Sequence, residues 1–125
     1  MSTLQAVPLD KAYRLLNHGP TVLVSSAHDG QHNVMAAAWA MPLDFDPPKI
    51  LVVIDKATHT RKLMEASGEF ALNVPGRDQA HAVVAAGSAS GADCDKFAAS
   101  GLQPMPAQRI GAPLVAGCSA YLECR

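Results

Sequence analysis

A short stretch of the chain carries an amide, a thioether and the chain's only tryptophan at every second position. In a β-strand, residues at every second position share one face of the sheet. One face of this strand would therefore hold Asn33, Met35, Ala37 and Trp39, and the other face would be small and apolar. Small residues allow a flat ligand or a second backbone to come close. The alternative is a half-exposed strand whose tryptophan covers a neighbouring loop.

A second group of residues has the chemistry of an anion site. Thr60 is predicted to be the N-cap of a helix over residues 61–66, and Gly68 is placed to follow the end of that helix. The first N–H groups of a helix have no partner inside the helix and bind phosphate readily. Arg61 and Lys62 add positive charge. An ordinary cap followed by two solvated basic residues is the alternative.

A third feature is the loop of small residues over 87–91, which includes Ser90. Lys96 follows this loop and is able to reach an anion. The alternative is a lysine on the solvated side of a helix. Lys96 is kept as a candidate ligand.

Other kinds of chemistry find little support. The five histidines are scattered, and although His28 and His32 flank a predicted turn, no third metal ligand lies nearby. No G-x-S-x-G pattern supports a nucleophilic serine. The three cysteines are an odd number without CxxC spacing, which favours reduced thiols in a cytosolic protein. We therefore expect no metal site and name no catalytic acid or base.

The elements that position these residues follow from periodicity and turn signals. In the first half, helical spacing predicts a helix over 8–17, and Asp29-Gly30 predicts a hairpin between two strands. We expect these strands over 21–26 and 32–41, an extended loop from Pro42 to Pro48, and a strand over 49–54. In the second half we expect a strand over 70–74, a helix from Asp78 to Ala86, a helix over 93–99 and a final strand from about 118.

Strands joined by hairpins, with helices in the longer connections, favour an antiparallel β-barrel or an α+β sheet. No G-x-G-x-x-G pattern is present, so a Rossmann domain is disfavoured. The 125 residues suffice for a single domain over 1–125. No signal peptide or membrane-spanning run is apparent, and we expect a cytoplasmic protein.

Composition excludes several classes of protein. Hydrophobic residues make up 49% of the chain, which excludes intrinsic disorder. The net charge of −1 gives no basic field for nucleic acid or an acidic membrane. Charged residues reach only 17%, below the ~25% that is usual for soluble proteins. We infer that part of the surface is covered in an oligomer or by further chain.

Several short motifs occur in one order along nearly the whole chain. They are Gly-Pro-Thr-Val-Leu-Val-Ser-Ser at 19–26, Asn33-Val34-Met35 with Trp39, Pro42 with Phe45-Asp46-Pro47-Pro48, Thr60, Ser-Gly-Glu-Phe-Ala-Leu-Asn-Val-Pro at 67–75, Ser90-Gly91 before Asp95-Lys96-Phe97, Pro-Leu-Val at 113–115 and Leu-Glu-Cys at 122–124. In this order the chain resembles the flavin reductase-like family.

The resemblance implies an FMN-binding split β-barrel, mainly β with helices in the connections. It also implies a homodimer with FMN near the subunit interface. Members reduce flavin with NADH or NADPH and often pass it to a monooxygenase, or they act as flavin electron carriers. Carried over by position, the cofactor-binding residues are Asn33, Met35, Ala36, Trp39, Thr60, Ser90 and Lys96. Asn33 and Trp39 would lie near the isoalloxazine ring, and Thr60 and Lys96 would serve the ribityl-phosphate end or the polar edge of the ring.

Three features depart from the family's pattern. Ala36 and Ala38 replace residues that often carry hydroxyls, and Asp44 stands where serine is common. The family also continues beyond the Leu-Glu-Cys motif with strands that close the barrel, so we expect this chain to be a C-terminally truncated barrel. These departures favour an alternative, a degenerate split barrel that dimerises without binding flavin.

Overall fold

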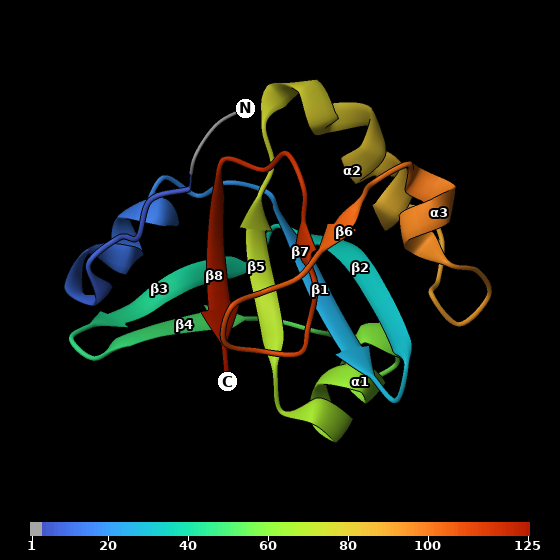
Figure 1. Ribbon diagram of the computed structural model, residues 1–125, viewed down its shortest axis with the longest axis horizontal. Coiled ribbons are helices and arrows are strands. Elements are labelled where there is room, and N and C mark those ends of the chain that lie inside the picture. Colours follow the sequence, from blue (N-terminus) through green and yellow to red (C-terminus); the bar gives the residue numbers. More distant parts are fainter. Residues whose placement is uncertain (1–3) are drawn as a thin grey trace.

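The computed structural model describes residues 4–125, and its centre is a four-stranded antiparallel sheet (Figure 1). The strand order is β2-β1-β5-β8. These strands are β1 (Val22–His28), β2 (Gln31–Ala37), β5 (Phe70–Val74) and β8 (Ala120–Cys124). Two smaller sheets pair β3 (Ala40–Phe45) with β4 (Pro48–Val52) and β6 (Pro104–Met105) with β7 (Leu114–Val115).

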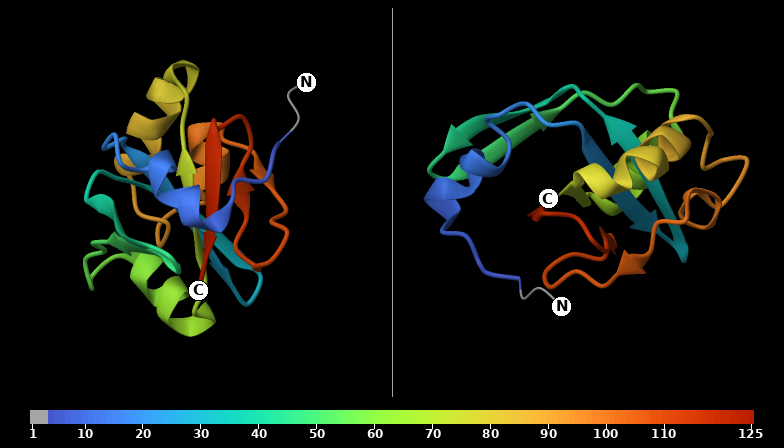
Figure 2. Two further views of the ribbon diagram at one scale, coloured as in Figure 1. Left: turned by 90° about the vertical axis from the view of Figure 1, so that its left-hand side faces the viewer. Right: turned by 90° about the horizontal axis from the view of Figure 1, so that it is seen from above.

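The first helix precedes β1, and the other helices lie in the connections between strands, as expected. They are the 3-10 helices η1 (Leu9–Leu15) and η2 (Arg77–Gln79) and the α-helices α1 (His59–Ser67), α2 (Ala80–Gly87) and α3 (Lys96–Ser100). The β3–β4 hairpin extends from the main sheet beside η1, and α2 and α3 lie at the opposite end of the molecule (Figures 1 and 2).

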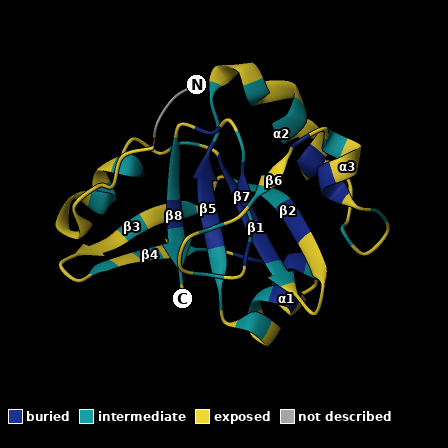
Figure 3. Ribbon diagram, viewed as in Figure 1, coloured by how far each residue is buried: buried dark blue, intermediate teal, exposed yellow. Residues whose placement is uncertain are grey.

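The central sheet has a hydrophobic core on each face. Because side chains alternate along a strand, Val22 and Val24 of β1 enter one core, together with Leu72, and Leu23 enters the other with Val34. The first core is extended by η1 and the base of the β3–β4 hairpin, and the second by α2 and α3. Figure 3 shows the burial concentrated on β1 and β5, with the hairpin largely exposed.

The prediction of a loop from Pro42 to Pro48 is wrong, because most of this segment belongs to β3 and β4. The strand expected over 32–41 ends at Ala37, the chain bends at Ala38, and β3 then runs through Pro42 to pair with β4. A two-stranded ribbon leaves one edge of each strand unpaired, so a proline without an N–H can be accommodated there. The pairing register shifts between Pro42 and Asp44, beside that proline.

Several helix boundaries also differ from the prediction. The first helix is 3-10 and shorter than 8–17. Asp78 lies within η2 rather than capping α2. The helix expected over 93–99 begins at Lys96, because Asp95 accepts hydrogen bonds from the N–H groups of Phe97 (3.1 Å) and Ala98 (3.4 Å) and so acts as its N-cap. The two-residue strands β6 and β7 are too short to produce a periodic signal. Among residues 4–125 no helix has the length and apolarity that a membrane span requires.

Candidate functional site

Helix α1 begins two residues earlier than the sequence predicts. The turn before it is tied by Asp55, whose backbone oxygen accepts hydrogen bonds from the N–H (3.1 Å) and the hydroxyl (2.7 Å) of Thr58. The Thr58 side chain in turn accepts from the N–H of Arg61 at 3.2 Å. Thr58 is therefore the N-cap, and the assignment of this role to Thr60 is wrong. Thr60 lies in the first turn of α1 and is buried.

Thr60 instead contacts the central sheet through Asn33 of β2. The Nδ2 atom of Asn33 donates to the Thr60 hydroxyl oxygen at 2.9 Å, and both side chains are buried. Two residues that the sequence places in a candidate ligand site, 27 positions apart, are thus in direct contact.

Two polar atoms next to this contact have no hydrogen-bond partner. They are Oδ1 of Asn33 and Oγ of Ser26, which are opposite each other in the pairing of β1 with β2. Asn33 is 1% exposed and Ser26 is 0% exposed, so both side chains lie in the interior. Buried polar atoms are nearly always hydrogen-bonded, so these two atoms need a structural explanation.

The small-residue loop lies against the same two elements. A Cβ atom on Gly91 would overlap Oδ1 of Asn33 and would come within 2.9 Å of the His59 ring at the start of α1. Ser90, the predicted ligand, is exposed and organises this loop, because its hydroxyl accepts from the N–H of Ala92 at 3.1 Å. Ser90 therefore lies one residue away from the segment that meets Asn33.

Lys96 is buried, with 6% exposure, at the start of α3. Its ammonium donates to the backbone oxygen of Ala86 in α2 at 2.7 Å. Burial lowers the pKa of this lysine, since a desolvated ammonium is less favourable than a hydrated one. One backbone acceptor leaves two of the three N–H bonds of the ammonium for other groups.

The segment that carries Lys96 is attached to β2 by its neighbours. Asp95 and the His32 ring approach to 3.3 Å, and the His32 ring meets Phe97 edge-on at 4.7 Å between centroids. The pKa of Asp95 is lowered, chiefly by the hydrogen bond from the Ala98 N–H and to a smaller extent by the nearby His32 ring. His32 immediately precedes Asn33, so α3 is attached to β2 next to the unsatisfied amide.

The remaining predicted ligands are dispersed. Met35 and Ala36 lie on opposite faces of β2 and pack against different cores. Trp39 lies beyond the end of β2, is 74% exposed and belongs to the outer surface of the hairpin. The structure therefore brings Asn33, Thr60 and the Ser90–Gly91 loop together and leaves the Trp39 side chain apart from them.

Sequence reasoning missed Ser26, His59 and Gly91. Ser26 was within reach of prediction, because pairing that counts back from the Asp29-Gly30 turn places it opposite Asn33. His59 and Gly91 meet only through the tertiary fold, and nothing in their spacing indicates this contact.

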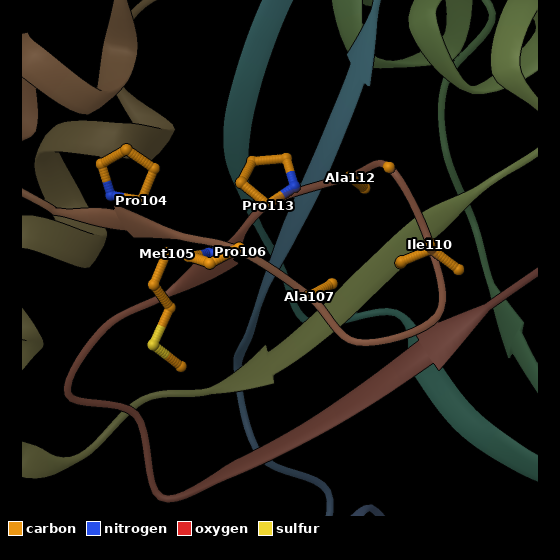
Figure 4. Close-up of a pocket in the computed structure, with 8 residues that line it drawn as sticks. Pro104, Met105, Pro106, Ala107, Ile110, Ala112 and Pro113 are labelled. Carbon is orange, nitrogen blue, oxygen red and sulfur yellow. The ribbon is translucent and has the colours of Figure 1, made fainter.

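An apolar pocket of about 300 Å³ lies elsewhere, between β6 and the segment leading to Pro113 (Figure 4). Met105, Ile110 and several prolines line it. Pro113 accepts a hydrogen bond from Ser25, whose side chain faces the opposite side of β1 from that of Ser26. The pocket offers no charged side chain for an anion, so its size does not make it the candidate site. Among residues 4–125 no group of His, Cys, Asp and Glu is arranged to hold a metal ion.

Comparison with known proteins defines the class. Residues 14–125 match the family model described as "Flavin reductase like domain". The FMN-binding domain of a flavin reductase-like enzyme from Shewanella baltica has the same fold, with a TM-score of 0.94 and 51% identity over 97% of this chain and 64% of that one. Flavoredoxin from Desulfovibrio vulgaris follows with a TM-score of 0.79 and 37% identity over 84% of this chain and 58% of that one.

Two curated relatives are similar to this chain over most of its length. Protein YddH of Escherichia coli is 44% identical over 100% of this chain and 68% of its own length. HsaB, the reductase subunit of a flavin-dependent monooxygenase in Mycobacterium tuberculosis, is 28% identical over 82% of this chain and 51% of its own length. The fold is thus a split barrel of the flavin reductase type, as expected from the resemblance. The chain belongs to the flavin reductase like domain family.

Proposed function

We propose that the protein binds FMN at the contact between β2, α1 and the Ser90–Gly91 loop. The observation that carries this proposal is the first turn of α1, whose uncapped N–H groups lie beside the contact of Asn33 with Thr60 and beside the Gly91 segment. The similar S. baltica protein is an FMN-binding domain, which supports this choice of ligand.

The residues present fit such a ligand. The first turn of α1 contains free N–H groups, and the buried Lys96 ammonium has hydrogen-bonding capacity left, so both suit the phosphate end. Met35 and Ala36 lie on β2, an edge strand whose outer main-chain groups suit the polar rim of a flat ring. Trp39 adds an exposed aromatic surface for the isoalloxazine ring.

We further propose that the protein is an NAD(P)H-dependent flavin reductase. FMN supplies the ring that accepts a hydride from NADH or NADPH and then passes on reducing equivalents. The chain's own residues would bind and orient the ring, and none is assigned as a catalytic acid or base. The similarity to HsaB supports a monooxygenase as the final acceptor.

Two alternatives have observations in their favour. Similarity to flavoredoxin favours an electron carrier without NAD(P)H activity. Ala36 and Ala38, which carry no hydroxyl, favour a module that has lost flavin binding. Steady-state oxidation of NADH and of NADPH, measured with and without added FMN, separates these functions. Turnover that depends on FMN is expected, while FMN binding without turnover would indicate the carrier.

We also propose a homodimer with FMN near the interface. The β3–β4 hairpin and the residues beside it present an apolar face whose side chains are each at least 45% exposed, namely Trp39, Met41, Leu43, Leu51 and Val53. On the opposite side of the ribbon, Ala40, Ile50 and Val52 pack against the core. A second copy would cover the exposed face and bring Trp39 into a protected site.

The three free cysteines suit a reducing compartment, and we propose that the protein is located in the cytoplasm.

A further inference from the structure

The segment from Gly91 to Phe97 passes around the outer edge of β2 (Figure 1). Strand β2 is an edge strand of the central sheet, and its adjacent residues His32 and Asn33 face opposite sides. Gly91 lies against Asn33 on one side. On the other side, the Phe97 ring meets the His32 ring edge-on, with 4.7 Å between centroids, and packs in the core that contains Val34. The segment therefore contacts both sides of one strand.

His32 also makes the polar contact that attaches this segment to β2. Its Nε2 atom lies 3.3 Å from Oδ1 of Asp95. A carboxylate oxygen only accepts hydrogen bonds, so the ring N–H donates. The same oxygen accepts from the N–H groups of Phe97 and Ala98, and the N-cap of α3 is thus also its attachment point on β2. Lys96 follows the cap directly, so this contact fixes where the lysine enters the molecule.

The charge on the His32 ring is able to change near neutral pH. The side chains of His32 and Asp95 are 38% and 56% exposed, so protons reach both from solvent. Histidine ordinarily becomes cationic below about pH 6.5. Asp95 remains ionised down to a lower pH, because its pKa lies below the ordinary 3.8. The contact therefore joins a cation to an anion in mild acid and a neutral ring to an anion in mild base, and the charge-assisted form is the stronger one.

The surroundings make Asp95 the main electrostatic partner of this ring. Ala27, which is uncharged, lies opposite His32 on β1. The ammonium of Lys96 donates to the backbone of α2 rather than facing the ring. Among residues 4–125, Asp95 is the one charged group in an ion pair or hydrogen bond with His32. The other titratable groups of the elements around it are His28 and Asp29 at the β1–β2 turn, His59 on α1, His81 on α2, and Asp93 and Cys94 before α3.

We propose that His32 is a positioning residue that holds the 91–97 segment on the edge of β2 in a pH-dependent manner, and that its effect on ligand affinity through Lys96 rests on the proposed FMN binding. A group that gains an anionic partner on folding stabilises the protein most where it is cationic. The attachment is therefore strongest in mild acid and weakens as the pH rises through the range in which histidine loses its proton.

A double-mutant cycle without any ligand tests the attachment itself. His32→Gln keeps a side-chain N–H donor but does not titrate, and Asp95→Asn keeps an oxygen that caps α3 but has no charge. Melting temperatures are measured for the wild type, both single variants and the double variant at pH 5.5 and at pH 8. His28→Gln is the matched control, because His28 is an exposed histidine at the end of the neighbouring strand.

At pH 5.5, His32→Gln should lower the melting temperature by about 1–4 °C, as for one partly exposed ion pair. The effect should be smaller at pH 8, and in the Asp95→Asn background it should be the same at both pH values. Amide hydrogen exchange locates the change, since residues 91–97 should exchange roughly twofold to fivefold faster in His32→Gln than in the wild type at pH 5.5. His28→Gln should show neither effect.

A titration with FMN tests the effect on ligand affinity. The dissociation constant of His32→Gln is divided by that of the wild type at each pH, which removes the titration of the ligand's own phosphate from the comparison. We expect a ratio of roughly two to five at pH 5.5 and a ratio closer to one at pH 8. A residue that only supports the fold would give the same ratio at both pH values.

Several results would overturn the inference. Additive effects of the two substitutions at pH 5.5 would show that His32 and Asp95 do not interact, and equal coupling at both pH values would show that the charge on the ring is irrelevant. The same coupling for His28→Gln would indicate a general charge effect. An FMN ratio that does not change with pH would separate the attachment from ligand affinity. If the wild type binds no FMN, the proposed function fails, and the ligand-free cycle still decides whether the attachment exists.

Discussion

At the scale of single residues, the most informative feature is the side-chain amide of Asn33, whose nitrogen is hydrogen-bonded while its oxygen is not. Asn33 donates to Thr60 at 2.9 Å, yet its oxygen is buried without a donor. Leaving a buried polar group unsatisfied costs about 1–3 kcal/mol, so the surrounding structure has to compensate.

Gly91 provides a direct test of the packing at this amide. Gly91→Ala would place a methyl group against Asn33 and His59, so the loop has to shift. We expect a loss of about 1–3 kcal/mol in the free energy of unfolding, as for other overpacked sites, measured by urea denaturation. Flavin affinity should change as well.

The matched control is Gly87→Ala, at the end of α2. A Cβ atom there would make an ordinary contact of 3.5 Å with Ala36, so stability should be unchanged or slightly higher. Equal effects of the two substitutions would show that Gly91 is not packed against Asn33 in solution.

At the scale of elements, β5 was predicted with its correct bounds, and the β1–β2 hairpin was predicted from the Asp29-Gly30 turn. The start of α1 was misplaced by two residues. Two threonines near that start are both suitable caps by type, and the choice falls on Thr58 because Asp55 ties the preceding turn. Such a turn is a matter of three-dimensional contacts, and residue preferences alone do not resolve it.

Helix α3 depends on a cap that also responds to pH. The Asp95 carboxylate accepts from two backbone N–H groups, and its pKa is lower than the ordinary 3.8. A carboxyl group with a lowered pKa in the folded state stabilises the protein above its unfolded pKa. This contribution is lost as pH falls through the folded pKa.

Asp95→Ala should therefore lower the melting temperature at pH 7, and the difference from the wild type should disappear in strong acid. Thermal unfolding followed by circular dichroism between pH 2 and 7 measures both. Asp93→Ala, at an exposed position in the preceding turn, serves as the control and should leave the melting temperature unchanged. A pH-independent difference for Asp95→Ala would argue against the carboxylate as the cap.

At the scale of the whole molecule, the fold class and the family were predictable, because motifs in a fixed order survive small errors in element boundaries. The β3–β4 hairpin was not predicted from the sequence. The prolines at 42, 47 and 48 were interpreted as loop, whereas the hairpin accommodates them at unpaired edges and at its turn. Its apolar face is consistent with the low charge of the chain, which already predicts a covered surface.

The proposed dimer gives a prediction at this scale. Leu51 is 45% exposed in the middle of the apolar face, and Leu51→Glu would place a charge in the interface. We expect the wild type to have the mass of a dimer and the variant the mass of a monomer, measured by light scattering after size exclusion. Val84→Glu, at a 68% exposed apolar position on α2, should keep the mass of the wild type. A monomeric wild type would remove the dimer from the account.

The central claim is that this chain binds FMN, and calorimetric titration of the wild-type protein with FMN tests it most directly. We predict saturable binding of one FMN per chain, with weaker binding of riboflavin because the contacts of the phosphate with α1 and Lys96 are lost. Absence of saturable binding for both ligands would contradict the claim and would favour the split-barrel module that does not bind flavin.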